Sequence, residues 1–204
     1  MANDLSRRQV LGLGVAGAVL ASLPLIAPRA AWALDVGQAR GLIDDVVGEI
    51  NRVINSGGSE AAMLGQFEAL FVRYADVPVI ARSVLGPAGR SASPAQIAGF
   101  TKAFQGYISR KYGRRFREFI GGRIEVADAR AVKSYYEVIT TAFLRGEAPF
   151  EVRFQVSDKS GKLLFFNIII EGVNMLASER TEIGAMLDRQ GGNLDALIAE
   201  LQTT

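Results

Sequence analysis

The sequence contains no cysteine and no histidine, and these two absences exclude several classes of protein. Without cysteine there is no disulfide framework and no thiol nucleophile, and without histidine there is no imidazole base and no His-containing triad. The two absences together exclude a zinc site built from His and Cys ligands. At 49% hydrophobic and 22% charged residues, the chain of 204 residues is nevertheless typical of a globular protein.

The N-terminus has the layout of an export signal. A positive start with Arg7 and Arg8 is followed by an uncharged apolar stretch over 10–26 and by the small-x-small sequence Ala-Trp-Ala at 31–33. The apolar stretch is short for a membrane-spanning helix, and Ser-Arg-Arg-Gln-Val-Leu at 6–11 is similar to a twin-arginine signal. We expect a signal peptide over 1–33, cleaved after Ala33, export to the periplasm, and a single domain over 34–204. An uncut N-terminal membrane anchor is the alternative.

Removal of residues 1–33 leaves basic and acidic residues in equal number, so the mature chain is expected to be neutral. A neutral exported domain is a poor candidate for nucleic-acid binding. Basic residues are nonetheless concentrated between 102 and 133, where Arg110, Arg114 and Arg117 recur at helical spacing. These three arginines are predicted to dock onto an acidic partner or anionic head groups, and a merely solvated helix face is the alternative.

The hydrophobic period changes from 3.6 to 2 at Gly122, which predicts helices followed by an antiparallel sheet. Ser93, Pro94 and Gln96 form the clearest local signal, a capping box that opens a long helix. The sequence therefore predicts an α+β fold with N-terminal helices on a curved antiparallel sheet and short C-terminal helices. Helices are expected over 36–54, 59–74, 76–86, 93–120, 180–189 and 193–201, and strands over 123–129, 134–144, 150–156 and 163–170.

Several segments, in order along the chain, resemble the MlaC, or toluene-tolerance, family. They are Asp-Val-Pro-Val-Ile-Ala-Arg-Ser-Val-Leu-Gly at 76–86, then Gln96, Phe100, Phe104 and Tyr112, Glu-Gly-Val-Asn-Met at 171–175, and Asp-Ala-Leu at 195–197. The sequence differs from the family pattern at Leu163, where Trp is expected, and at Asn167, where Asp is usual.

This resemblance implies a cone-shaped fold like that of nuclear transport factors and a function as a soluble periplasmic lipid carrier. Such a carrier is not an enzyme and is expected to be a monomer without cofactor or metal. It moves phospholipid between an outer-membrane lipoprotein complex and an inner-membrane ABC transporter with an MCE-domain component. An enzyme of the proton-transfer isomerase type on the same fold, or a periplasmic adaptor without ligand, are the alternatives.

A carrier of this kind needs apolar side chains that line a lipid site between helices and sheet, although the same side chains can also serve simply as core. The predicted lipid-binding residues are Val79, Ile80, Val84, Phe100, Phe104, Ile108, Tyr136, Val138, Phe154, Phe166, Ile168, Ile170, Val173 and Met175. Glu171, at the end of an apolar strand, is predicted to hold a neighbouring Arg or the backbone of the following turn, and a catalytic role is the alternative.

Overall fold

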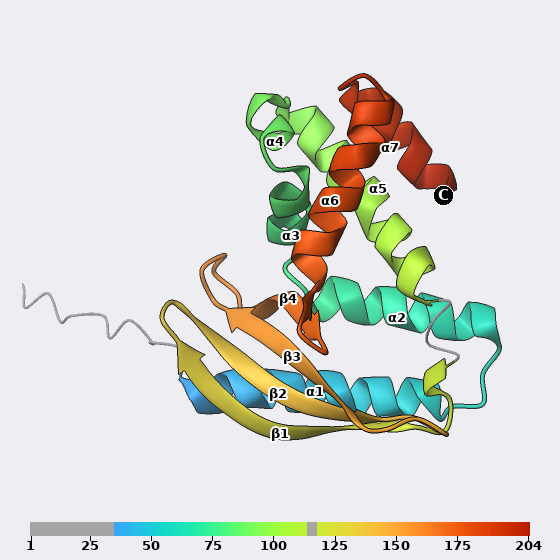
Figure 1. Cartoon of the computed structure of the whole chain (residues 1–204), viewed down its shortest axis with the longest axis vertical. Coiled ribbons are helices and arrows are strands. Elements are labelled where there is room, and N and C mark those ends of the chain that lie inside the picture. Colours follow the sequence, from blue (N-terminus) through green and yellow to red (C-terminus); the bar gives the residue numbers. More distant parts are fainter. Residues whose placement is uncertain (1–34, 114–117) are drawn as a thin grey trace, which may run out of the picture. The chain divides into compact units, whose positions relative to one another are not determined.

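The computed structural model describes residues 35–113 and 118–204, so the predicted signal peptide lies outside the described residues. Helices and strands follow each other much as the sequence predicts (Figure 1). The helices are α1 (Val36–Ile54), α2 (Glu60–Tyr74), α3 (Val77–Leu85), α4 (Ala88–Ser91), α5 (Pro94–Gly113), α6 (Met175–Arg189) and α7 (Leu194–Thr203). Within the described part of the chain, no helix is long and apolar enough to span a membrane.

Local capping decides where most helices begin. Asp35 and Gln38 form a capping box at the start of α1, and Ser59, Asp76 and Asn193 cap α2, α3 and α7. The capping box predicted for α5 is present: the Gln96 backbone N–H donates to Ser93 Oγ at 3.2 Å, and the Ser93 backbone N–H donates to Gln96 Oε1 at 3.1 Å.

The strands form one antiparallel sheet in the order β1-β2-β3-β4-β5. They are β1 (Arg123–Val132), β2 (Tyr135–Phe143), β3 (Phe150–Ser157), β4 (Leu164–Ile170) and β5 (Val173–Asn174). No residue of β4 is exposed, as expected for a strand covered on both faces. The α+β fold class is confirmed.

Two helix boundaries differ from the sequence-based expectation. The described part of α5 ends at Gly113, and residues 118–120 form a short turn rather than the end of a long α-helix. Helix α6 begins at Met175, earlier than expected, because the side chain of Asn174 accepts a hydrogen bond from the Ala177 N–H and caps the helix directly after β5.

Glu171 lies in the tight turn between β4 and β5. Glu171 and Gly172 have φ values of 49° and 82°, which is the left-handed conformation that a two-residue hairpin turn requires at both central positions. Glu171 is exposed there, and its backbone N–H donates to the Glu151 carbonyl at 3.1 Å. The backbone of Glu171 makes this contact, so a structural role for its side chain stays a prediction.

Candidate functional site

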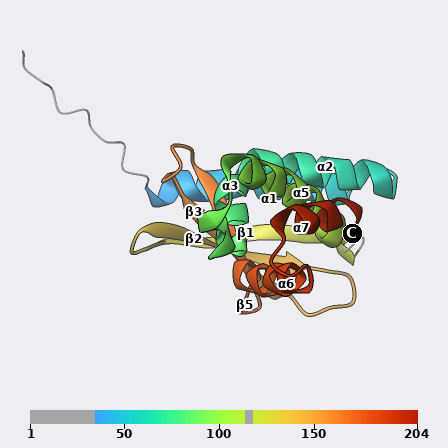
Figure 2. The same cartoon turned by 90° about the horizontal axis from the view of Figure 1, so that it is seen from above.

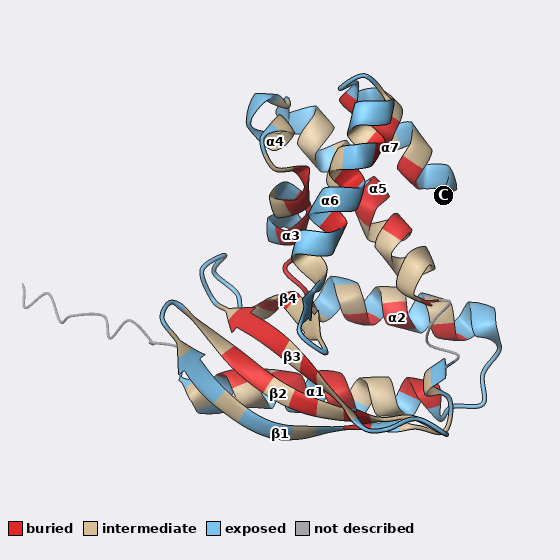
Figure 3. Ribbon diagram, viewed as in Figure 1, coloured by how far each residue is buried: buried red, intermediate tan, exposed pale blue. Residues whose placement is uncertain are grey.

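One face of the sheet carries the apolar interior of the domain. Strand register aligns Ala129, Val138, Phe154 and Ile168 in a row across β1 to β4. Helix α1 packs on this inner face, against β1, β2 and β3. In this layer, buried residues lie mainly on β2, β3 and α1 (Figure 3). The two layers thus enclose a continuous apolar region.

Polar side chains of α1 bond to the backbone at the start of the edge strand β1. The Asn51 side chain donates to the Ile124 carbonyl and accepts from the Ile124 N–H, each at 2.8 Å. Arg40 donates to the Val126 carbonyl at 3.2 Å. These bonds satisfy backbone groups at the start of β1 and hold α1 against the sheet.

Most of the predicted lipid-binding residues meet in one core cluster around this interior. Some are fully buried and others are half-buried against the cluster; the members are Ile80, Val84, Phe100, Phe104, Ile108, Tyr136, Val138, Phe154, Ile168 and Ile170. Phe100 and Phe104 stack with centroids 5.7 Å apart, and Phe154 meets Phe165 edge-on. The sequence pattern therefore identified residues that pack together, but it does not distinguish lining from core.

The remaining predicted lipid-binding residues lie elsewhere. Val79 and Phe166 line a separate groove near the tips of two hairpins. Val173 is 54% exposed on the short edge strand β5, and Met175 is half-buried at the start of α6. Neither Val173 nor Met175 belongs to the core cluster.

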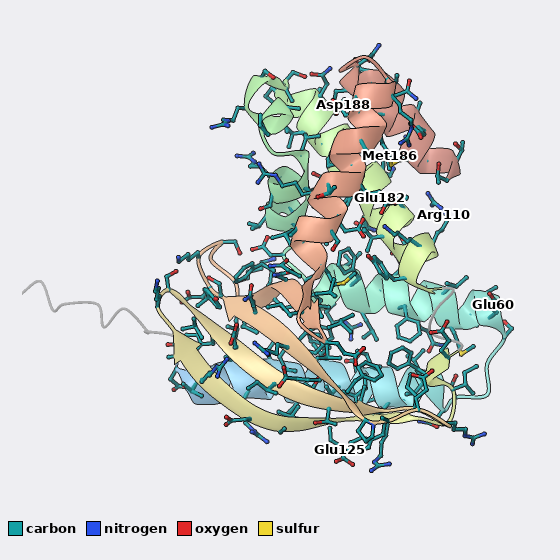
Figure 4. The ribbon with its side chains drawn as sticks, in the orientation of Figure 1. Glu60, Arg110, Glu125, Glu182, Met186 and Asp188 are labelled. Atoms are coloured by element: carbon teal, nitrogen blue, oxygen red, sulfur yellow. The ribbon has the colours of Figure 1, made fainter. Side chains whose placement is uncertain are left out.

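A second cluster of buried residues joins the far end of α1 to α2. It consists of Val53, Ile54, Met63, Phe67 and Leu70. Ile50, Tyr74 and Phe119 are half-buried and pack against both clusters. Helix α2 packs on α1 and α5, whereas its contacts with the strands are weaker. We call the boundary between the two clusters, marked by Ile50, Tyr74 and Phe119, the seam. Apolar and aromatic side chains fill the region between α2 and the α1–sheet layer (Figure 4).

Tyr74 gives the seam a polar edge. Its hydroxyl donates to Glu49 Oε1 at 2.7 Å, and Arg73 Nη1 contacts the same oxygen at 3.0 Å. The hydrogen bond to Glu49, together with burial, raises the pKa of Tyr74, so the hydroxyl remains a neutral donor. The ring of Tyr74 therefore faces apolar side chains while its hydroxyl is satisfied by a surface ion pair.

Sequence analysis missed the seam. The stripe of Met63, Phe67, Leu70 and Tyr74 has the spacing of an amphipathic helix, and the same pattern that predicts α2 could have placed these residues among the candidates. Ile50 lies in the apolar stripe of the helix expected over 36–54, and Phe119 lies in that of the helix expected over 93–120. Only tertiary packing brings the two residues together.

The outer face of the sheet carries a row of polar side chains instead, of which Glu137, Gln155 and Asn167 are buried. Arg130 donates to Glu137 at 2.7 Å, Gln155 donates to Glu137 at 3.2 Å, and Asn167 donates to Gln155 at 3.0 Å. The Asn167 amide also donates to Asn174 Oδ1 at 3.0 Å, and its own oxygen accepts from the Leu176 N–H at 3.0 Å. This polar row ties the edge strand β1, through every strand between, to the start of α6.

Burial raises the pKa of the Glu137 carboxyl, but the hydrogen bonds from Arg130 and Gln155 outweigh it, so the pKa lies below its ordinary value. A charged, hydrogen-bonded carboxylate in this row is consistent with a structural role on the face that does not hold the apolar interior.

Helices α5 and α6 are joined by a second polar cluster around Lys111. Its ammonium group contacts Glu179 at 2.8 Å and also bonds Glu182, while Tyr107 donates to Glu182 at 2.6 Å. Tyr112 donates to Glu179 as well. Figure 4 labels Glu182, which lies where α6 faces α5. Burial and the bond to Glu182 raise the pKa of Tyr107 to about 12, so this tyrosine is a neutral donor at physiological pH.

Of the predicted docking arginines, Arg110 is the one that the structure describes. It is half-buried, and its Nη2 donates to the Leu201 carbonyl of α7 at 2.6 Å, so it serves to hold α5 and α7 together. Arg114 and Arg117 lie outside the described residues. Docking by these arginines stays a prediction.

Val79 and Phe166, which were both predicted to bind lipid, line a groove of about 400 Å³. It lies between the start of α3 and the β1–β2 and β3–β4 hairpins. Figure 2 shows the sheet and the helices of this domain from a second direction. Apolar residues share this groove with serine hydroxyls, a lysine and the buried carboxyl of Asp76. Tyr135 also lines the groove and accepts a hydrogen bond from Gln155 of the outer face at 3.3 Å, so the groove lies on the outer side of the sheet.

Comparison with known proteins agrees with this architecture. A solved structure of a phospholipid-binding protein from Ralstonia solanacearum, in complex with a phospholipid, superposes with a TM-score of 0.67 at 18% sequence identity. The match covers 80% of this chain and 98% of that one, so the two share a fold. The family model for the MlaC protein matches residues 42–203, and the chain therefore belongs to the MlaC family.

Proposed function

We propose that the chain binds a phospholipid, with its acyl chains in the apolar interior between α1, α2 and the inner face of the sheet. The observation that carries this proposal is the seam. The two apolar clusters meet there through residues that are only partly buried. Helix α2, on one side of the seam, has only weak contacts with the strands. Separation of α2 from the sheet at the seam would create space for acyl chains without breaking the α1–sheet layer.

The energetics explain why a carrier would need such an interior. Exposure of an acyl chain to water costs about 0.8 kcal/mol per CH₂ group, so two chains of sixteen carbons cost roughly 25 kcal/mol. A protein that moves phospholipid through water has to cover almost all of that surface. Membership in the MlaC family and the fold shared with a phospholipid-bound protein support phospholipid as the ligand.

The proposal extends to the cellular role. We infer that the chain is exported to the periplasm and carries phospholipid between an outer-membrane lipoprotein complex and an inner-membrane MCE-domain ABC transporter. The export signal predicted over 1–33 and membership in the MlaC family support this role. The buried carboxylates Glu137 and Glu179 are held in hydrogen bonds within polar clusters, and the buried Asp76 caps α3. These structural roles favour binding over proton-transfer catalysis.

Native mass spectrometry of protein purified from membrane-bearing cells tests the proposed ligand. We expect a population with the mass of the mature chain plus one phospholipid, released as phospholipid on denaturation. A homogeneous ligand-free protein that also fails to extract phospholipid from vesicles would contradict the proposal.

A further inference from the structure

We propose that two hollows that share the exposed start of α3 form a docking surface for an acidic segment of a partner protein. This inference rests on the proposed carrier function, because a carrier has to dock where it takes up or delivers lipid. The larger hollow, the α3–α5 hollow, has a volume of about 700 Å³ and is lined by α3, α4 and the first half of α5. The smaller is the hairpin groove of about 400 Å³ between α3 and the two hairpins.

The start of α3 joins the two hollows into one surface. Pro78 lines the α3–α5 hollow and Val79 lines the hairpin groove, and both are exposed although the other apolar residues of α3 are buried. Ile97 and Ala98 of α5 continue the apolar lining on one side, and Phe166 of β4 continues it on the other. Apolar hollows of this kind receive protruding side chains of a protein partner.

Cations without partners line both hollows. Arg82 and Lys102 line the α3–α5 hollow from α3 and α5, and Lys159 lines the hairpin groove from the β3–β4 turn. All three are exposed, and in the part of the chain that the structure describes none of them forms an ion pair. Asp76, a lining residue with a carboxylate, is buried and caps α3. The charge that the lining presents to solvent is therefore positive.

The surroundings keep this charge positive. Further exposed cations lie in α4 and in the two hairpin turns, at Arg90, Lys133 and Lys162, against the neighbouring carboxylates of Glu68 and Asp158. Such a surface attracts an anionic partner. A flat anionic bilayer would meet the cations but leave the apolar hollows unfilled. A protein segment with carboxylates around apolar side chains complements both features, so shape and charge together favour a protein.

Binding kinetics with purified complexes test the charged part of this surface. The probes are the inner-membrane MCE-domain transporter and the outer-membrane lipoprotein complex, each in nanodiscs of zwitterionic lipid, at low and at about 0.15 M salt. Arg82→Glu and Lys102→Glu are expected to slow association with at least one complex about tenfold at low salt and less at the higher salt. Arg52→Glu, the same charge change at an exposed position of α1 that lines neither hollow, is expected to associate like wild type.

A second pair of variants tests the apolar hollow. Ala98→Trp places a bulky side chain in the α3–α5 hollow and is expected to weaken binding at both salt concentrations. Ala61→Trp, at an exposed position of α2 outside both hollows, is expected to have no effect. Circular dichroism confirms that folded proteins are compared, and native mass spectrometry is expected to find the phospholipid content of wild type in every variant.

Wild-type association by Arg82→Glu, Lys102→Glu and Ala98→Trp would overturn the docking surface and leave the proposed phospholipid binding intact. The same variants losing affinity only for protein-free anionic vesicles would identify a membrane contact, and a wild-type dimer that Arg82→Glu dissociates would identify a second copy of the chain. Either result would also overturn the proposal. Wild type that binds neither complex would overturn this surface together with the proposed cellular role.

Discussion

At the scale of single residues, Ile168 lies at the centre of the proposed acyl-chain site. It is half-buried on the inner face of β4, opposite Phe154, and packs against the core cluster. Its neighbour Ile169 is also half-buried but points to the outer face and is not part of that cluster. A glutamate at each position in turn therefore separates the effect of a charge in the apolar interior from the effect of a charge elsewhere on the same strand.

Ile168→Glu is expected to abolish lipid retention and to lower the free energy of unfolding by several kcal/mol, because an unpaired carboxylate in an apolar environment is strongly unfavourable. Ile169→Glu is expected to retain lipid. Lipid content after purification and urea denaturation measure the two effects. Wild-type lipid content in Ile168→Glu would remove this strand from the site.

Glu137 makes the polar row sensitive to acid. Because hydrogen bonds lower its pKa in the folded protein, Glu137 contributes stability above its unfolded-state pKa, and this contribution disappears as the pH falls through the folded-state pKa. Glu137→Gln is therefore expected to lose less stability than wild type between about pH 7 and about pH 3. Urea denaturation at both values measures the slopes, with the exposed Glu125→Gln as control; parallel slopes for wild type and Glu137→Gln would contradict the prediction.

At the scale of elements, the starts of helices could be predicted from local caps. The polar row across the sheet could not be predicted, because it depends on long-range contacts. The starts of α1, α2 and α5 depend on side chains within a few residues, so local sequence indicates them. The polar row depends on strand register between residues such as Arg130 and Glu137, and on Asn167 meeting Asn174. No local pattern encodes such pairings, so the buried Glu137 and Gln155 were not foreseen.

The candidate site was predictable to the same extent. Apolar positions on α5 and the inner strand faces follow from periodicity, and they do assemble in one cluster. The exposed position of Val173 was not foreseen, because β5 is an edge strand of only two residues that pairs with β4 alone. Val173 therefore lies at the exposed edge of the sheet and not in the apolar interior.

The Lys111 cluster is expected to hold α5 against α6. The Glu179 side chain is nearly fully buried, and in the described part of the chain its second oxygen lacks a hydrogen-bond partner. Lys111→Gln would leave this carboxylate without its cation, and we expect a loss of about 3 kcal/mol in the free energy of unfolding. The double variant Lys111→Gln/Glu179→Gln should recover part of that loss in urea denaturation. A double variant as unstable as the sum of both single variants would show that the two groups do not interact.

At the scale of the whole molecule, transfer requires docking as well as binding. If Arg114 and Arg117 meet acidic partners or anionic head groups, Arg114→Glu/Arg117→Glu should slow lipid transfer between vesicles and reduce its salt dependence. Arg110→Glu is a separate case, because loss of its bond to the Leu201 carbonyl should loosen α7. Transfer rates at low and about 0.15 M salt measure the effect. Rates equal to wild type at both salt concentrations would mean that these arginines are only solvated.

The central claim is that acyl chains lie between α1, α2 and the inner face of the sheet. Photo-crosslinking with a phospholipid that carries a diazirine at the end of one acyl chain, followed by peptide mapping, tests it most directly. We predict crosslinks to the seam and the inner face, at Ile50, Tyr74, Phe119 and Ile168. Crosslinks confined to outer-face residues such as Ile139 and Ile169, or their complete absence from a chain that still binds the lipid, would contradict the account.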